Sequence, residues 1–113
     1  MKEEFLDYVE DIIEAMNDAM GFVENTEYAA FVKDRKTIYA VTRALEIVGE
    51  AVKHIPLTVK NRYPQIPWKD MAGMRDKVIH EYFGVDLKRV WRTVNEDIPK
   101  LKPAFEKILK DSK

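Results

Sequence analysis

The sequence predicts an all-α protein, built as an antiparallel four-helix up-and-down bundle. Apolar residues recur at three- and four-residue steps over most of the chain, and strand-like alternation never extends beyond a few residues. Short connections join the periodic segments, as in antiparallel bundles. The 113 residues are 46% hydrophobic, which suits one core. We therefore expect a single domain over residues 1–113.

The first half of the chain predicts two long helices. One apolar stripe begins at Phe5, and Gly21 follows it where a helix would end. A short turn of helix is expected over residues 26–33. The second stripe runs from Ile38 to Ile55 and is stopped by Pro56, which makes this the longest predicted helix without an internal proline.

A connection and a third helix follow. Three prolines within residues 56–67 break the helical period, so we interpret this segment as a connection with one irregular turn. Pro67 suits the first position of the third helix. Gly84 can adopt the left-handed conformation that ends such a helix, so this helix is predicted to extend to the "YFG" sequence.

The fourth helix is predicted to begin after Asp86, a plausible N-cap. Apolar residues keep a helical rhythm from residue 87 to residue 108, across Pro99 and Pro103. One helix kinked at Pro99 explains this better than two unrelated helices. The large aromatic residues suit packing better than ligand binding, and we assign these to the core or to a dimer contact: Phe5, Trp68, Trp91 and Phe105.

Composition excludes several classes of function. The net charge of −1 and the pI near 6.1 give no overall field that would attract a polyanion, so any nucleic acid must bind a local patch. The first residues include acids among the apolar positions and resemble neither a signal peptide nor a membrane span. We expect a cytoplasmic protein. The absence of cysteine removes disulfides and thiol catalysis.

No metal or cofactor is expected. The chain has two histidines, no cysteine and no HxxxH or HExxH pair, and no glycine-rich phosphate loop occurs. Glu46 and Glu50 lie one helical turn apart with Arg43 nearby, which suits either a carboxylate pair for chemistry or an exposed helix face with ion pairs. Spacing favours the exposed face.

The segment "GMRDKVIHEYFGVD" contains several residues whose side chains could take part in a reaction. Gly73 inside a helix costs about 1 kcal/mol relative to alanine, which would be explained by the close approach of another backbone or a ligand. Arg75 offers a planar fork of donors suited to a phosphate. His80 could be a structural residue near a helix end, as His54 is expected to be at the end of the second helix.

Helical geometry limits how these side chains can meet. At about 100° per residue, Arg75 and Tyr82 share one line, and His80 points roughly 140° away from Arg75. Either the helix loosens near His80, or two copies of the chain build one site. RNA cleavage by the 2′-hydroxyl benefits from a base and an acid, and a two-fold dimer offers two histidines. Arg75 would stabilise charge on the phosphate without a metal.

The residues of this segment resemble those of a known protein family. "RDKVIHEY" has the arginine, four residues, histidine, one residue, tyrosine pattern of HEPN-domain ribonuclease toxins of the HepT-like kind, and Asp76 after the arginine fits the same pattern. "KDRKTIYAVTRALEIVGEAVK" resembles the second helix of the family. The segment from "YPQIPW" to "DIPKLK" resembles its third and fourth helices.

The resemblance implies a HEPN fold that dimerises, with Arg75 and His80 of both copies lining a cleft where RNA is cut without a metal, and with Asp76 in support. It implies a type II-like toxin–antitoxin system whose antitoxin is a minimal nucleotidyltransferase. Tyr82 is implied to accept AMP from that antitoxin, and an adenylate near Arg75 would compete with the RNA phosphate. Lys77 and Arg43 are candidates for contacts with RNA.

Two other hypotheses stay open. The chain could be a non-catalytic helical partner, or a nucleotide- or substrate-binding subunit, of a nucleotidyltransferase. It could also be a structural dimer in which Arg75 and His80 form a buried polar cluster, in which case losing His80 would destabilise the protein.

Overall fold

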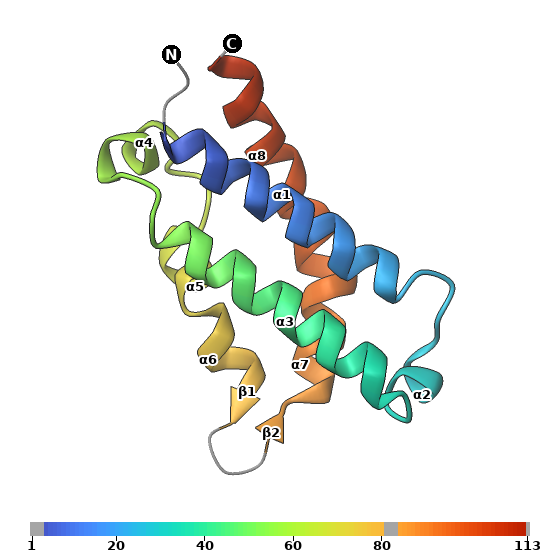
Figure 1. Cartoon of the computed structure of the whole chain (residues 1–113). Helices are drawn as coiled ribbons and strands as arrows, with labels where there is room; N and C mark the ends of the chain where they lie inside the picture. The colour runs from blue at the N-terminus through green and yellow to red at the C-terminus, as the bar shows by residue number, and fades with distance from the viewer. Residues whose placement is uncertain (1–3, 81–83, 113) are drawn as a thin grey trace.

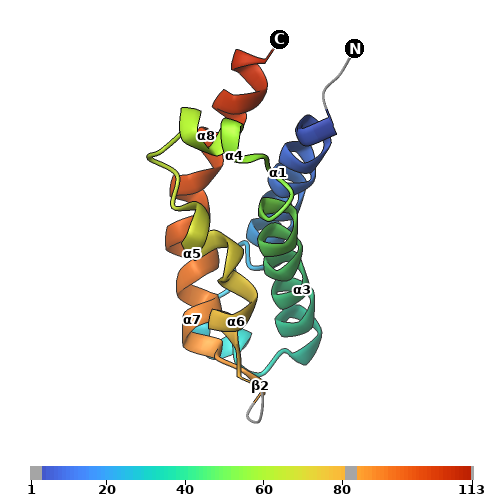
Figure 2. The same cartoon turned by 90° about the vertical axis from the view of Figure 1, so that its left-hand side faces the viewer.

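The computed structural model describes residues 4–80 and 84–112, with the backbone alone for 77–80 and 84–85. The described residues are almost entirely helical, so the all-α class is confirmed. The helices pack in two layers, which Figure 2 shows side by side. α1 (Glu4–Phe22) and α3 (Arg35–Val52) form one layer. The other holds α5 (Trp68–Ala72), α6 (Met74–Val78) and the path of α7 (Leu87–Arg92), η1 (Thr93–Asp97) and α8 (Ile98–Asp111).

The first layer forms where the two apolar stripes predict it. α3 runs back alongside α1 (Figure 1), and the short helix α2 (Tyr28–Phe31) lies in their connection as expected. α1 continues through Gly21 to Phe22, so the prediction that Gly21 ends it was wrong by two residues. α3 begins after Asp34, whose side chain accepts a hydrogen bond from Thr37 N at 3.1 Å.

The proline-rich connection contains a six-residue helix, α4 (Leu57–Arg62), between Pro56 and Tyr63. Tyr63 is 8% exposed, and its hydroxyl donates to Asp111 Oδ2 at 2.8 Å. The main-chain oxygen of Tyr63 accepts a hydrogen bond from Trp68 Nε1 at 3.0 Å. One residue therefore attaches this connection both to the end of α8 and to the start of α5.

The third helix differs most from its prediction. It begins at Trp68, as expected, but Gly73 separates α5 from α6, and α6 ends at Val78. The backbone then becomes extended: β1 (Ile79–His80) pairs antiparallel with β2 (Gly84–Val85), with His80 opposite Gly84. The prediction of one helix carrying the whole motif up to Gly84 was wrong, because a helix that has ended cannot hold His80. Figure 1 shows this hairpin at the end of the molecule opposite the termini of the chain.

The fourth helix is a continuous helical path with one irregularity. Asp86 is its N-cap, as predicted, and accepts from Arg89 N at 3.1 Å. The irregular turn is the π-helical segment η1, which ends two residues before Pro99. Pro99 then occupies the first turn of α8, directly after the π-helical turn, and Pro103 lies inside α8.

Buried apolar residues from both layers form one cluster. Phe5 and Phe105 belong to it, and Trp68 and Trp91 pack against it as partly buried residues, which confirms their assignment to packing. Trp68 meets Phe105 edge to face, with ring centroids 5.6 Å apart. In the part of the chain that the structure describes, no helix has the length and apolar character needed to cross a membrane.

Candidate functional site

An ion-paired cluster joins α3 to α6. Arg75 Nε lies 3.5 Å from Glu46 Oε2, and Arg43 Nη1 lies 3.7 Å from the same oxygen. Glu46 is the least exposed of the three, with 20% of its side chain accessible, whereas Arg75 keeps 54%. One carboxylate oxygen therefore holds two guanidinium groups, and Arg75 remains accessible to a ligand.

A second carboxylate lies on the other side of Arg75. Arg75 Nη1 is 3.8 Å from Asp76 Oδ1, and the Asp76 side chain is 85% exposed. Both distances to Arg75 are long for ion pairs, and pairs this exposed contribute about 1 kcal/mol or less. An incoming phosphate could replace them at the guanidinium at little expense, and so the cluster is suited to binding an anion.

The backbone of α6 is positioned by a close helix crossing at Gly49. A Cβ atom added at Gly49 would lie 3.2 Å from Met71 O and 3.5 Å from Ala72 O, so a larger residue there would require α3 and α5 to shift slightly apart. Gly73 does not have this role. Among the described residues, a Cβ there would meet nothing nearer than Lys69 O at 3.6 Å, so no other backbone approaches Gly73 closely, and the alternative of a ligand stays a prediction.

The remaining motif residues extend beyond the helix. His80 has extended backbone in β1, so the alternative in which the helix loosens before His80 is confirmed for the main chain. The roughly 140° separation expected on one regular helix therefore does not apply to Arg75 and His80. The side chains of Lys77 and His80, and Tyr82 as a whole, lie outside the described residues.

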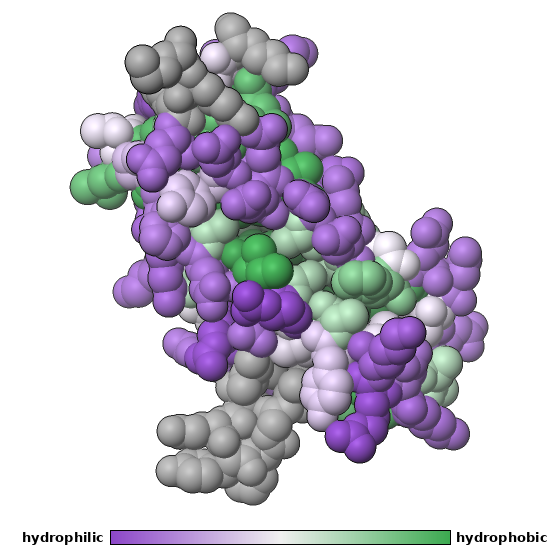
Figure 3. Space-filling model, in the orientation of Figure 1, coloured by the Kyte–Doolittle hydropathy of each residue, from purple (hydrophilic) through white to green (hydrophobic). Residues whose placement is uncertain are grey.

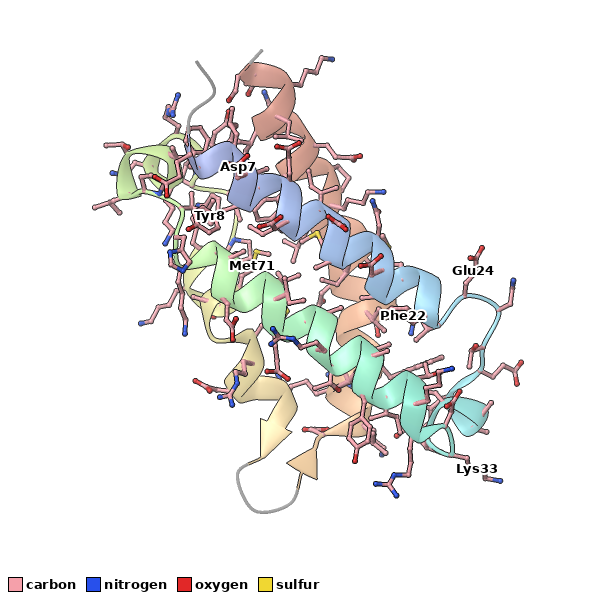
Figure 4. The ribbon with its side chains drawn as sticks, viewed as in Figure 1. Asp7, Tyr8, Phe22, Glu24, Lys33 and Met71 are labelled. Carbon is pink, nitrogen blue, oxygen red and sulfur yellow. The ribbon has the colours of Figure 1, made fainter. Side chains whose placement is uncertain are left out.

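Glu50 and His54 lie outside the Arg75 cluster. Glu50 is exposed on α3 and is not part of the Arg75 cluster, so the carboxylate pair does not form around that arginine. His54 stacks flat on Tyr8, with ring centroids 4.6 Å apart and planes 9° from parallel. Figure 4 labels Tyr8 near the start of α1, at the end of the molecule remote from the hairpin. Among the described residues, no group of three carboxylate or imidazole side chains is placed to hold a metal ion.

Sequence reasoning missed two features of the site. Glu46 was considered with Glu50 and Arg43, but its contact with Arg75 on α6 was not predicted. The role of Gly49 was not predicted. A buried glycine within a long helix is itself a signal of close backbone approach, because alanine would be favoured there otherwise.

The exposed face of α3 is mixed in character. Figure 3 shows apolar surface near the middle of the view, where Figure 1 places α1 and α3, bordered by hydrophilic side chains. Tyr39 is 59% exposed, and Ile47 is partly buried. The two residues are eight positions apart, which puts them on similar sides of α3 together with Arg43. Arg43, which contacts Glu46, thus borders an apolar strip formed by Tyr39 and Ile47.

The chain matches known proteins along nearly its whole length. The family model for ribonuclease HepT-like proteins matches residues 12–108. "Probable ribonuclease HepT" of Thermococcus cleftensis is 53% identical over 110 residues, which cover 97% of this chain and 100% of that protein. "Putative RNase MJ1216" of Methanocaldococcus jannaschii is 49% identical, over 97% of this chain and 91% of the relative.

A bacterial relative is also similar. "Putative RNase TTE0752" of Caldanaerobacter subterraneus is 41% identical over 106 residues, covering 94% of this chain and 95% of that protein. No solved structure matches the chain.

Proposed function

Because this chain belongs to the HepT-like ribonuclease family, we propose that it is a metal-independent endoribonuclease and the toxin of a HEPN/MNT toxin–antitoxin system. The main support for the proposal is the accessibility of Arg75 and its position between two carboxylates. Its guanidinium is half exposed, is held between Glu46 and Asp76, and starts the motif that reaches His80 five residues later.

The proposed reaction needs only side chains. The ribose 2′-oxygen attacks the adjacent phosphorus, the bond from phosphorus to the 5′-oxygen breaks, and a 2′,3′-cyclic phosphate remains. His80 of one copy takes the proton of the 2′-hydroxyl, and His80 of the second copy gives a proton to the leaving 5′-oxygen. Arg75 stabilises the charge that develops on the phosphate oxygens, and Asp76 orients Arg75.

The homodimer supplies the second histidine. The apolar strip at Tyr39 and Ile47 is a surface that a second copy could cover, which would bring Arg43 to the edge of the shared cleft. Arg43 and Lys77 would then contact the RNA backbone. The four-helix bundle with a kink at Pro99 belongs to the same proposal and is supported by the two-layer packing and by the irregular turn before Pro99.

Regulation would act at Tyr82. This residue lies in the chain between β1 and β2, two residues after His80. Transfer of AMP to its hydroxyl by a minimal nucleotidyltransferase would add bulk and negative charge close to the cleft. The adenylate would then occupy Arg75 in place of the RNA phosphate and silence the toxin.

The decisive experiment incubates purified protein with RNA in the presence of a metal chelator. We expect fragments that end in a 2′,3′-cyclic phosphate, lost in His80→Ala and Arg75→Ala. His54→Ala is the matched control, because His54 stacks on Tyr8 and has no place in the proposed cleft. Restoration of cleavage only by added divalent cation would overturn the metal-independent mechanism.

The non-catalytic alternative predicts the same partner but another result. A nucleotide- or substrate-binding subunit of a nucleotidyltransferase would cut no RNA, whether or not His80 is intact. Mass spectrometry of Tyr82 must accompany the assay, since an adenylylated preparation would be silent on either hypothesis. Unmodified, folded protein without cleavage would favour the binding subunit.

A further inference from the structure

A separate pocket adjoins the motif helix. Its volume is about 280 Å³, and it lies between the α5–α6 segment and the path α7–η1–α8, two segments that Figure 2 shows side by side. Met71, Met74 and Leu101 supply apolar surface, Arg89 and Lys100 supply positive charge, and Asp70 and Asp97 supply negative charge. The volume is near the lower end of the range for small-molecule sites, about 300–1,000 Å³, so one nucleotide fits better than two.

The irregular turn η1 builds part of this pocket. Asp97 is the last residue of η1 and precedes α8 at the N-cap position, yet its side chain makes no capping hydrogen bond. Asp97 has helical φ and ψ angles of −77° and −47°, whereas Asp34 and Asp86 have non-helical angles and cap α3 and α7. π-helical turns are rare and occur often at functional sites. Asp97 lines the pocket, and its carboxylate makes no capping hydrogen bond.

The two cations of the pocket are also largely available. Arg89 Nε approaches Asp86 only to 3.9 Å, and about half of the Arg89 side chain is exposed. Lys100 is exposed on α8. Both line the same pocket as Asp97, so anion-binding and hydrogen-bond-accepting groups surround a surface of two methionines and a leucine. Methionine side chains adapt well to the face of a flat aromatic ring.

We propose that this pocket binds one unpaired guanine nucleotide of the RNA substrate, an inference that rests on the proposed ribonuclease function. The base would pack on Met71, Met74 and Leu101. Guanine has adjacent N–H donors on its base-pairing edge, and the Asp97 carboxylate can accept from both. Arg89 and Lys100 would hold the phosphate of the same nucleotide. A purely acidic ligand would offer the Asp97 carboxylate no donor, and a purely apolar ligand would offer the charged groups no partner.

The position on α6 connects the pocket to the cleavage site. Met74 lines the pocket, and the next residue, Arg75, contacts Glu46 on α3. Consecutive residues of α6 would therefore contact the nucleotide in the pocket and the phosphate that Arg75 holds. The pocket would select which phosphate reaches Arg75 and His80, and cleavage would depend on the identity of the neighbouring base.

The test uses mononucleotides as probes and the methionines as reporters. GMP, AMP, CMP and UMP are titrated into full-length protein with ¹³C-labelled methionine methyl groups. GMP should shift the Met71 and Met74 signals most strongly and AMP more weakly. Met16, buried in α1, and Met20, which lines a different pocket beside α1, serve as internal references. Shifts confined to Met20, or none with any nucleotide, would overturn the proposal and would favour a protein partner for this surface.

Matched variants then test the chemistry. Asp97→Asn should weaken GMP binding about tenfold or more and remove the preference over AMP. Glu96 precedes Asp97 in the chain and does not line the pocket, so Glu96→Gln should leave the GMP affinity and the preference over AMP unchanged. Lys100→Ala should weaken all four nucleotides, and its control Lys102→Ala should not. Equal GMP affinity in Asp97→Asn and the parent would refute the guanine assignment. Because binding is measured without cleavage, this outcome is distinct from failure of the ribonuclease proposal.

Discussion

Arg75 has a carboxylate on either side before any RNA arrives. Glu46 is the less exposed partner and comes from a different helix, so it can fix the direction of the arginine. Glu46→Ala should therefore lower the cleavage rate at saturating RNA about tenfold and change the stability by less than about 1 kcal/mol, since Arg75 is half exposed and can be solvated. Single-turnover cleavage and chemical denaturation measure the two effects.

The control for this variant is Glu50→Ala, which removes an exposed carboxylate one turn further along α3. It should cleave RNA like the parent. If both variants lost activity equally, a general effect of charge on α3 would explain the data better than an oriented Arg75.

Tyr63 forms a polar contact with Asp111, which is far from it in the sequence. Loss of this contact should destabilise the fold. Burial and the nearby Asp111 carboxylate raise the pKa of Tyr63 above its usual value of 10.0. Hydrogen bonds from Lys107 and Tyr63 lower the pKa of Asp111 below its usual value of 3.8. Tyr63→Phe should lower the thermal midpoint by about 4 °C near pH 7.

The pH dependence of that difference has a definite sign. The lowered pKa of Asp111 stabilises the fold above pH 3.8, and this contribution is lost as the pH falls further. The raised pKa of Tyr63 stabilises the fold below pH 10.0, and this contribution is lost as the pH rises through the higher folded value. Thermal scans of both proteins should diverge between these limits and converge outside them. A difference that grew below pH 3.8 would contradict the assignment.

At the scale of elements, the crossing of α3 and α5 is set by Gly49. Gly49→Ala gains about 1 kcal/mol of helix propensity. However, the new methyl group would meet the backbone oxygen of Met71 at 3.2 Å, and a backbone atom cannot rotate aside. We expect a net destabilisation of about 1 kcal/mol and several-fold slower cleavage, because α6 and Arg75 must shift.

Gly21→Ala is the matched control, since nothing lies within 4 Å of the added atom. It should stabilise α1 by up to about 1 kcal/mol and leave cleavage unchanged. Urea denaturation of both variants decides the matter. A Gly49→Ala protein as stable as Gly21→Ala would show that α3 and α5 can separate freely.

The sequence predicts some elements better than others for a physical reason. α3 has a long apolar stripe and forms where that stripe predicts it, although it ends at Val52, before the predicted end at Ile55. The third helix has neither a long stripe nor a strong stop, and its end at Val78 depends on pairing between Ile79 and Val85. Likewise, Arg75 was predicted as a site residue from its own chemistry. Its partner Glu46 was not, because that contact joins residues far apart in the sequence.

At the scale of the whole molecule, charge limits how RNA is held. The net charge is −1, so binding should rely on a few local cations. About three phosphate contacts to a single strand give a slope of about −2 for log affinity against log salt concentration. Fluorescence anisotropy of RNA with the His80→Ala protein measures this slope. A slope of about −5 or steeper would require a broad basic surface and contradict a local site.

The two ends of the described chain, at α1 and α8, lie at the end of the molecule opposite the hairpin, along a longest dimension of 45 Å. A fluorescent protein or a surface anchor attached to either end would therefore stand well away from His80. Fusions at both ends therefore offer a way to test whether two copies meet on RNA without covering the hairpin.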